Sequence, residues 1–226
     1  MKFFYYSLFL LFLIFSLPTF AINTDDELDS GVHEPLFVDL VRPINSKKGQ
    51  LEINSLCAKS SKYHCSPELE YVIADGLGLE LELPMDHNFQ LESLKIAIQK
   101  KINFTFNKNY DHAFQLINEK KLHHKKNSTT FYYVSGFNKN DYSFVMLNGF
   151  AKSQKKYSIL LNSTFYKNFN KDFAYGIEVN YDKTADFSLR ILPQAKFHFN
   201  KKCELQIGVG IEKKYMAGAL RIISII

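Results

Sequence analysis

The sequence predicts an all-β protein: an antiparallel transmembrane β-barrel of about twelve strands, preceded by an N-terminal signal peptide. Three observations predict this fold. Apolar and polar residues alternate with a period of two over most of the chain from residue 49 onward, as in strands with one apolar face. Each alternating segment is roughly ten residues long, the length of a strand that crosses a bilayer at a tilt. The segments are even in number and are joined by short turns, as in outer-membrane barrels.

The first residues are typical of a signal peptide. A lysine at position 2 precedes an apolar run over residues 3–17, and Thr19-Phe20-Ala21 offers a cleavage site after Ala21. An uncleaved membrane anchor is the alternative, but the run is shorter than the ~20 apolar residues that a spanning helix needs. We therefore expect residues 1–21 to be removed on export.

Residues 22–47 form a leader of different composition. Its first part, TDDELDS, is acidic and without periodicity, so we expect it to be mobile. Its second part, HEPLFVDLVRP (residues 33–43), is more apolar and contains two prolines. This segment is expected to pack across one end of the barrel or to insert into it as a plug. The barrel itself is assigned to residues 48–226.

The clearest hairpin lies in residues 67–84, PELEYVIADGLGLELELP. Apolar residues alternate with polar or small ones on both sides of Asp75-Gly76, and Asp-Gly between such runs marks a tight hairpin. A three-residue loop with Gly76 in the left-handed conformation would place both apolar sets on one face. In that register Tyr71 pairs with Leu81.

The other strands follow from the same alternation. A fourth strand over residues 89–102 changes phase near Glu92-Ser93, which predicts a bulge. Pro193 falls inside the tenth strand, where it costs a ladder hydrogen bond unless it lies at a bulge. The remaining strands are expected at residues 49–55, 111–122, 131–137, 142–150, 157–165, 173–181, 187–199, 204–212 and 216–226.

Alternate connections share one chemistry. The sequences NKN (138–140), NFNK (168–171) and NKK (200–202) recur at every second junction, like Asp75-Gly76. The two ends of the barrel are therefore expected to differ.

The apolar rows are expected to face lipid. They carry aromatic residues near strand ends, as the interfacial girdles of membrane barrels require. The opposite rows combine small residues with charges of both signs, which suits a wet interior. A lipocalin-like barrel or a soluble sandwich is the alternative. The girdle residues are Tyr157, Phe165, Phe173, Tyr181, Phe187, Phe197 and Phe199.

With its signal peptide, its ELEY…GLELELP hairpin and strands running to the last residue, the chain resembles Gram-negative outer-membrane barrels. More narrowly, HEPLFVDLVRP and KKGQLEIN resemble the start of the family labelled putative MetA-pathway of phenol degradation and related transporter-like barrels. The resemblance implies a place in the bacterial outer membrane, with membrane lipid, lipopolysaccharide and the barrel-assembly machinery as partners. The chain departs from the pattern by ending in Ile225-Ile226 and not in an aromatic residue.

The inward rows carry the candidate functional residues. We expect a polar lumen that acts as a passive channel or transporter for small solutes, with its charges setting the field. Alternatively, opposite charges pair and fill a narrow lumen, which gives a closed structural or surface-interaction barrel. The inward candidates are Glu52, Glu68, Glu70, Glu80, Glu82, Lys95, Glu178, Arg190, Lys196, Glu204, Glu212 and Arg221.

The cysteines and the overall charge limit other functions. Cys57 and Cys65 flank a short polar stretch and could be oxidised after export, but Cys203 makes the count odd, so their pairing stays open. No CxxC motif supports a metal site. The net charge of +5 is too small and too evenly mixed to predict nucleic-acid binding.

A lipid-modifying enzyme is the third hypothesis. It needs a nucleophile, a histidine and an orienting group in one constellation. The sequence has no GxSxG motif, and neither His64 beside Cys65-Ser66 nor His112 beside Asp111 forms a recognisable pattern. His123-His124 is expected in a solvated loop. The sequence therefore predicts no catalytic residue, cofactor or metal.

Overall fold

The computed structural model describes residues 34–36, 41, 44, 46–59, 62–103, 110–123, 127–154, 156–183, 188–200, 202–212 and 215–226, apart from the side chains of Glu212 and Tyr215. The predicted signal peptide and most of the predicted leader lie outside these residues. Within the described part of the chain, no helix is both long and apolar enough to cross a membrane.

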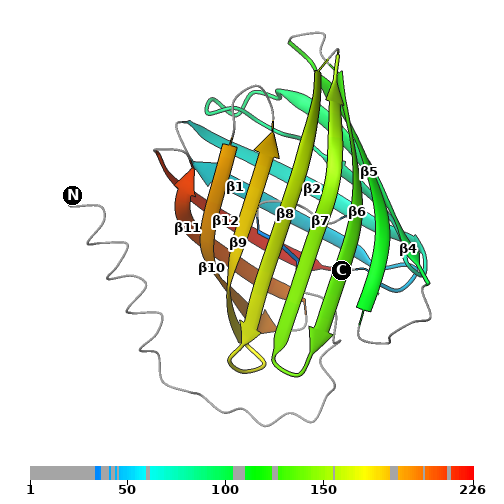
Figure 1. Cartoon of the computed structure of the whole chain (residues 1–226), viewed down its shortest axis with the longest axis vertical. Helices are drawn as coiled ribbons and strands as arrows, with labels where there is room; N and C mark the ends of the chain where they lie inside the picture. The colour runs from blue at the N-terminus through cyan, green and yellow to red at the C-terminus, as the bar shows by residue number, and fades with distance from the viewer. Residues whose placement is uncertain are drawn as a thin grey trace. The chain divides into compact units, whose positions relative to one another are not determined.

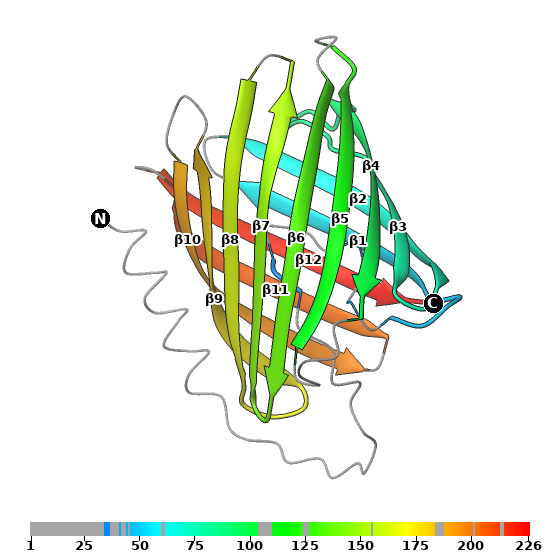
Figure 2. The same ribbon diagram turned by 45° about the vertical axis from the view of Figure 1, so that its right-hand side comes forward.

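Twelve described strands form one closed antiparallel barrel, in which each strand pairs with its neighbours in sequence and β1 pairs with β12 (Figure 1). This confirms the predicted fold class. In Figure 2, β6 to β8 cross β11, β12 and β1 at a steep angle, as the strand tilt of a closed barrel requires. The strands are β1 (Leu51–Lys59), β2 (Tyr63–Ala74), β3 (Leu77–Glu82), β4 (Ser93–Ile102), β5 (Tyr110–Lys121), β6 (Asn127–Lys139), β7 (Tyr142–Ser153), β8 (Lys156–Asn168), β9 (Phe173–Lys183), β10 (Ser188–Asn200), β11 (Cys203–Glu212) and β12 (Tyr215–Ile225).

The apolar rows face outward and the polar rows face inward. Large apolar side chains such as Ile96 and Phe150 are each 54% exposed, whereas Glu70, Glu178 and Arg221 are fully buried. Soluble monomers rarely expose contiguous apolar surface beyond a few hundred Å². Exposed large apolar residues occur on every described strand except β6, whose outward Phe131, Tyr133 and Phe137 are half-buried. The barrel is therefore of the transmembrane type, with lipid outside and polar groups inside.

The β2–β3 hairpin differs from the predicted register. Gly76 has the expected positive φ of 68°. However, Tyr71 pairs with Leu79 and not with Leu81, because the register shifts between Val72 and Ala74. Asp75-Gly76 forms a two-residue turn, and the extra residue is a bulge at Ile73 in β2. The bulge, and not a longer loop, brings the two apolar rows onto one face.

The start of β4 also differs from the prediction. The strand begins at Ser93, and residues 86–90 form a turn in which Phe89 has a φ of 58°. Met85 makes isolated bridges with Cys65 and with Leu91. The change of phase near Ser93 therefore marks the beginning of a strand and not a bulge within one.

Pro193 does not lie at a bulge. It pairs with Ile177 of β9, but the ladder between β10 and β11 lacks pairs at Leu192 and Pro193 while its register continues unchanged. The register shift of this ladder lies further on, between His198 and Asn200. The proline thus interrupts the ladder without inserting a residue, as expected for a residue that has no N–H.

The two ends of the barrel can be named from the chain. Ile226 N–H donates to Leu51 O at 2.9 Å, so β1 begins where β12 ends, at what we call the terminal end. The turns after β2, β6, β8 and β10 lie at this end, which places the recurring Asn-rich turns on one side of the barrel. The opposite side, which we call the loop end, carries the longer β3–β4 connection of residues 83–92.

Candidate functional site

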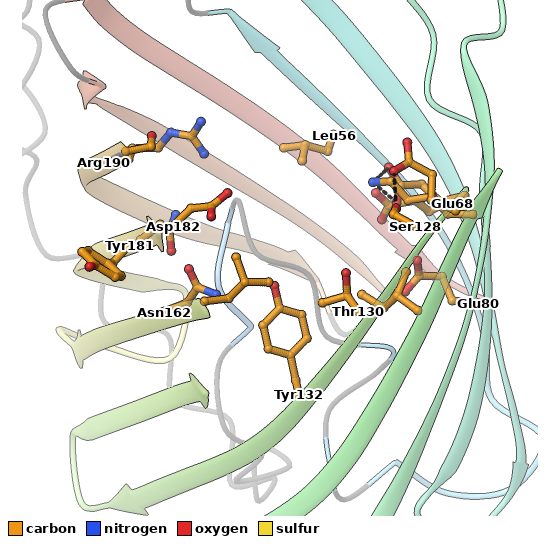
Figure 3. A pocket seen from close by; sticks show the side chains of 17 residues that line it. Leu56, Glu68, Glu80, Ser128, Thr130, Tyr132, Asn162, Tyr181, Asp182 and Arg190 are labelled. Atoms are coloured by element: carbon orange, nitrogen blue, oxygen red, sulfur yellow. Dashed lines mark hydrogen bonds and ion pairs between the residues drawn. The ribbon is translucent and has the colours of Figure 1, made fainter. Parts of the chain in front are cut away.

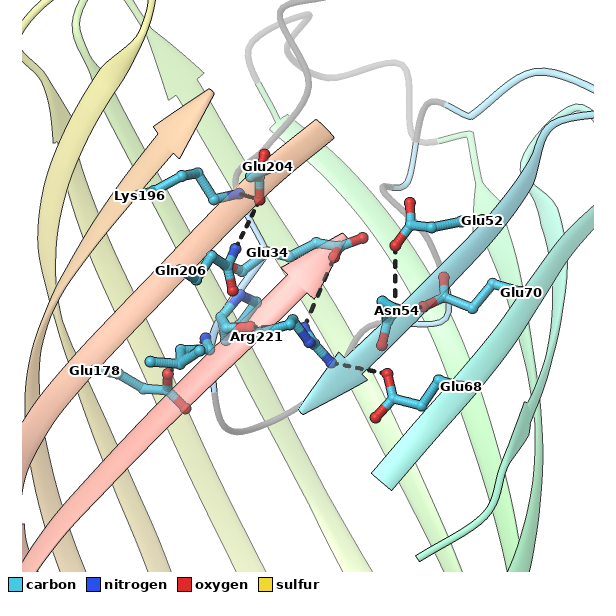
Figure 4. Close-up of polar contacts among 12 residues, drawn as sticks. Glu34, Glu52, Asn54, Glu68, Glu70, Glu178, Lys196, Glu204, Gln206 and Arg221 are labelled. Atoms are coloured by element: carbon cyan, nitrogen blue, oxygen red, sulfur yellow. Dashed lines mark hydrogen bonds and ion pairs between the residues drawn. The ribbon is translucent and has the colours of Figure 1, made fainter. Parts of the chain in front are cut away.

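The described leader residues contact the inner wall of the barrel. Glu34 O accepts hydrogen bonds from Tyr166 Oη and Gln206 Nε2, each at 3.3 Å. Leu36 N–H donates to Glu178 Oε2 at 2.8 Å. Glu34 is 4% exposed and Leu36 is fully buried. Since these partners come from the inward rows of β8, β9 and β11, this part of the leader lies in the lumen (Figure 4).

Arg221 of β12 joins the leader to the barrel wall. Its Nη2 lies 3.2 Å from Glu68 Oε2 of β2, and its Nη1 donates to Pro35 O at 3.2 Å and lies 3.8 Å from Glu34 Oε2. The side chain is fully buried. Burying a guanidinium is costly, and these carboxylate and carbonyl partners offset that cost.

Three carboxylates meet beside this contact. Ligand oxygens of Glu34, Glu52 and Glu70 all lie within 4.8 Å of one another. Asn54 Nδ2 donates to Glu52 Oε1 at 3.2 Å and to Glu70 Oε1 at 2.6 Å (Figure 4). These are the described residues whose oxygen chemistry suits a hard divalent cation. An acidic cluster does not by itself define a metal site, and none is assigned.

Predicted residues form two further ion pairs, and His198 contacts one of them. Lys196 Nζ lies 2.8 Å from Glu204 Oε1, and His198 Nδ1 lies 3.1 Å from the second oxygen of the same carboxylate. Lys95 Nζ lies 2.7 Å from Glu82 Oε2. Opposite charges across neighbouring strands are thus brought into contact, as the filled-lumen alternative requires.

A cavity of about 350 Å³ occupies the lumen toward the loop end (Figure 3). Its position follows from lining residues such as Ser128, Asp182 and Ser188, which lie within two residues of the loop-end limits of their strands. The predicted residues Glu68, Glu80, Glu82, Lys95 and Arg190 line it. A second cavity of about 310 Å³ lies at the same end.

Several lining residues were not predicted as site residues. They are Leu56, Ile117, Glu119, Ser128, Thr130, Tyr132, Leu160, Asn162, Asn180, Tyr181, Asp182 and Ser188. The inward phase of β6 and β8 was available as a signal for Tyr132 and Asn162. Asp182 gave little signal, because alternation does not distinguish the last residues of a strand from a loop.

The predicted inward set therefore divides into two groups. One group lines the cavity and the other lies with the leader. Glu68 belongs to both, because it lines the cavity and contacts Arg221. Glu178, Lys196, Glu204 and Arg221 lie with the leader and away from the cavity, and Glu70 pairs across the β2–β3 ladder with Glu80. The side chain of Glu212 lies outside the described residues.

Leader residues also belong to the apolar groups beneath the cavity. Leu36 shares a buried cluster with Leu56, and Ile44 shares another with Tyr132. Leu56 and Tyr132 also line the cavity. The side chains that close the cavity toward the terminal end are therefore packed in the same clusters as the leader.

Cys57 and Cys65 form a disulfide between β1 and β2, where the two residues face each other in the ladder. Cys203 is in no disulfide. The bond lies near the loop end, close to Ser66, which lines the second cavity. The disulfide links the two strands directly at this end of the barrel.

The histidines considered for catalysis lie apart. His112 shares the outward row of β5 with Phe114, and its Nδ1 is 2.8 Å from Tyr133 Oη. His64 and His123 line the second cavity, and His123 Nε2 lies 3.1 Å from Leu91 O. His124 lies outside the described residues. His112 thus belongs to the outer surface and not to the lumen.

A family model described as HAEPLYID-like matches residues 31–156, more than half of the chain. The chain belongs to the HAEPLYID-like family. The match includes the HEPLFVDL segment and the first strands of the barrel. No curated protein sequence matches the chain. The narrower resemblance to the putative MetA-pathway of phenol degradation family is not supported by this match.

Solved structures with the same fold are outer-membrane porins and channels. The KdgM porin in complex with disordered oligogalacturonate has a TM-score of 0.65 at 16% identity, over 76% of this chain and 98% of the porin. The NanC porin has a TM-score of 0.61 at 9% identity, over 77% and 98% of the two chains. An outer membrane channel from Pseudomonas putida F1 has a TM-score of 0.61 at 9% identity, over 90% and 100%. At these identities the likeness establishes the fold.

Proposed function

We propose that this HAEPLYID-like protein is a passive outer-membrane channel for small solutes, with its own leader as a plug in the lumen. The observation that carries the proposal is a closed barrel with an apolar exterior and a polar cavity of about 350 Å³ inside it. A barrel filled completely by side chains would leave no such space. The porins with the same fold support the assignment.

The plug is supported by the contacts of its described residues. Glu34, Pro35 and Leu36 bond to four different strands, and Leu36 and Ile44 are packed among apolar groups of the wall. These contacts lie in the terminal half of the lumen, whereas the cavity opens toward the loop end. Solute could therefore enter from the loop end, and its exit would require the leader to move.

The two ends of the barrel suggest its orientation in the membrane, and the loop end suggests partners. In outer-membrane barrels the shorter turns face the periplasm and the longer loops face outward. On this basis the loop end faces the exterior. Exposed lysines there include Lys59, Lys121, Lys152 and Lys183, which suits contact with lipopolysaccharide phosphates. We propose membrane lipid, lipopolysaccharide and the barrel-assembly machinery as partners, together with small solutes.

The cargo of the KdgM porin is not carried over to this chain. Its complex contains oligogalacturonate, a chain of sugar acids with repeated negative charge. The cavity described here is lined by more carboxylates than cations. A polyanion would therefore meet repulsion at this wall.

A closed barrel without conductance is the second candidate. The Arg221 contacts with Glu34 and Glu68, together with the Lys196–Glu204 pair, fill much of the terminal half with bonded charges. Such a barrel would act as a structural or surface-interaction protein. Of the residues considered for catalysis, His112 lies on the outward row of β5, so Asp111-His112 does not support an enzymatic site in the lumen.

The test is conductance of the refolded protein in planar lipid bilayers. We expect the chain from Ile22 onward to show rare or small open steps, and a deletion of residues 22–46 to show frequent and larger ones. A deletion of residues 22–32 is the matched control, because it keeps Glu34 to Ser46 and should behave like the longer chain. Heat-modifiable migration in gels verifies that each protein is folded.

Folded barrels that stay electrically silent in all three forms would overturn the channel and favour the closed barrel. Equal conductance in all three forms would keep the channel and remove the plug.

A further inference from the structure

The wall of the loop-end cavity is acidic although the protein as a whole is basic. The chain carries a formal net charge of +5. Its described lining residues include two cations, Lys95 and Arg190, against five carboxylates, a formal excess of three negative charges. The carboxylates are Glu68, Glu80, Glu82, Glu119 and Asp182. The negative charge is thus concentrated inside the lumen, while the excess of lysine and arginine lies elsewhere.

The cations around this wall do not balance it. Arg221 lies outside the lining but contacts Glu68, and counting it still leaves an excess of two negative charges. Lys95 Nζ contacts Glu82, and Lys95 also pairs across the β4–β5 ladder with Glu119, so one cation faces two carboxylates. Arg190 and Asp182 both line the opposite side of the cavity, as Figure 3 shows. A confined space with protein walls strengthens the field of such charges and concentrates counter-ions.

The rest of the wall combines neutral hydrogen-bonding groups with the apolar side chains of Leu56, Ile117 and Leu160. Thr130 and Tyr132 of β6 and Asn162 of β8 lie between the two charged sides (Figure 3). Glu80 and Glu82 are only 4% and 5% exposed, so their positions are fixed by the surrounding strands. A volume of about 350 Å³ is near the lower limit of small-molecule sites. The cavity therefore suits a small ligand that has ammonium groups and further hydrogen-bonding atoms.

We propose that this cavity is a binding site for small organic cations such as polyamines, and that Glu80 and Glu82 are the residues that select them. The inference deepens the proposed channel by naming its solute class. It rests on that proposal for transport only, because binding can be measured in a barrel that does not conduct.

The experiment is isothermal titration calorimetry of the refolded full-length mature chain, with spermidine and trigalacturonate as probes. We expect saturable binding of spermidine that weakens at high salt, and no binding of trigalacturonate. The double variant Glu80→Gln/Glu82→Gln should weaken spermidine binding by roughly tenfold or more, because it removes two buried partners of the cation.

The matched control is Asp141→Asn/Asp172→Asn, which removes two carboxylates from exposed terminal-end turns. It should leave spermidine binding unchanged. If the glutamine variant fails to fold, Glu80→Asp/Glu82→Asp keeps the charge and tests whether its placement matters. Equal weakening of spermidine binding in Glu80→Gln/Glu82→Gln and in Asp141→Asn/Asp172→Asn would overturn the proposal. Tighter binding of trigalacturonate than of spermidine would also overturn it.

Conductance measurements distinguish failure of the proposed binding site from failure of the proposed channel. A silent barrel that binds spermidine would remove the channel and keep the site. A conducting barrel that shows no cation preference and no spermidine binding would remove the site and keep the channel.

Discussion

Arg221 connects three separate parts of the chain, because its guanidinium contacts Glu68 of β2 and both the carboxylate of Glu34 and the carbonyl of Pro35. Replacing it by methionine leaves two buried carboxylates without this cation. We therefore expect Arg221→Met to lower the free energy of unfolding by about 3–5 kcal/mol. Urea-induced unfolding of the barrel in detergent micelles would measure the change.

Lys101→Met is the control for that variant. Lys101 Nζ lies 3.0 Å from Asp111, but the lysine side chain is 29% exposed. A partly exposed pair contributes about 0–1 kcal/mol. If Arg221→Met lowered the free energy of unfolding no more than Lys101→Met, the buried Arg221 contacts would contribute no more to stability than a partly exposed ion pair.

Asp86 lies outside the strands, in the β3–β4 connection, and its titration can be followed separately. Its Oδ1 accepts the N–H groups of Gln90 at 2.9 Å and Asn88 at 2.8 Å. The hydrogen bond from Gln90 is the main cause that lowers its pKa below the ordinary value of 3.8, and that from Asn88 adds to it. Both bonds favour the charged form.

The sign of the pH dependence follows from this depressed pKa. The charged carboxylate stabilises the turn at pH values above the unfolded pKa of 3.8, and the contribution is lost as the pH falls through the lower folded pKa. We expect the NMR titration of the Asp86 carboxyl carbon to have its midpoint below 3.8. A midpoint at or above that value would show that the turn does not hold the carboxylate.

At the scale of a strand pair, β8 and β9 approach closely where Gly176 pairs with Tyr166. A Cβ at Gly176 would collide with Phe165 O and would lie 2.8 Å from the Tyr166 ring. We expect Gly176→Ala to lower the free energy of unfolding by about 1–3 kcal/mol, because the strand or the ring must shift. Gly218→Ala is the control, since its Cβ would find only Gly208 O at 3.9 Å. Similar urea midpoints for both variants would contradict the close packing.

The strands themselves were predictable because alternation is a local signal. All twelve segments expected from the period of two correspond to strands of the barrel. The β2–β3 register was predicted wrongly, because one bulged residue at Ile73 has the same effect on alternation as one extra loop residue. The start of β4 was predicted wrongly because residues 86–90 form a turn closed by the bridge between Met85 and Leu91, which the local pattern does not identify.

The site was predictable only where it lies on regular strands. Glu80, Glu82 and Lys95 follow from the inward phase of β3 and β4. Glu119 was missed because the alternation of β5 is weak. The contacts of Glu34 with residues 132 and 172 positions away could not be read from any local pattern, since they depend on the closed barrel. The sequence left open whether the leader packs across one end of the barrel or inserts into it. The structure shows specific contacts between the described leader residues and the inner wall.

At the scale of the whole molecule, the lumen has two unlike halves. The terminal half holds the leader and the bonded charges around Arg221, and the loop-end half holds the acidic cavity. A channel built in this way would bind its solute before the leader moves. Solute binding and plug release could then be coupled, and each can be altered separately by substitutions in its own half.

The inverted polarity of the whole barrel gives the last prediction. Leu161 lies on the outward row in the middle of β8 and is 46% exposed, whereas Tyr157 lies near the loop-end start of the same strand and is 68% exposed. With lipid outside, Leu161→Arg should cost about 2–4 kcal/mol of folding free energy, and Tyr157→Arg only about 0–1 kcal/mol, because the cost of a charge depends on its depth. Guanidinium-dependent folding into lipid vesicles would measure both. If water surrounded the barrel, both arginines would be nearly neutral surface substitutions, and equal small effects would therefore refute the membrane orientation.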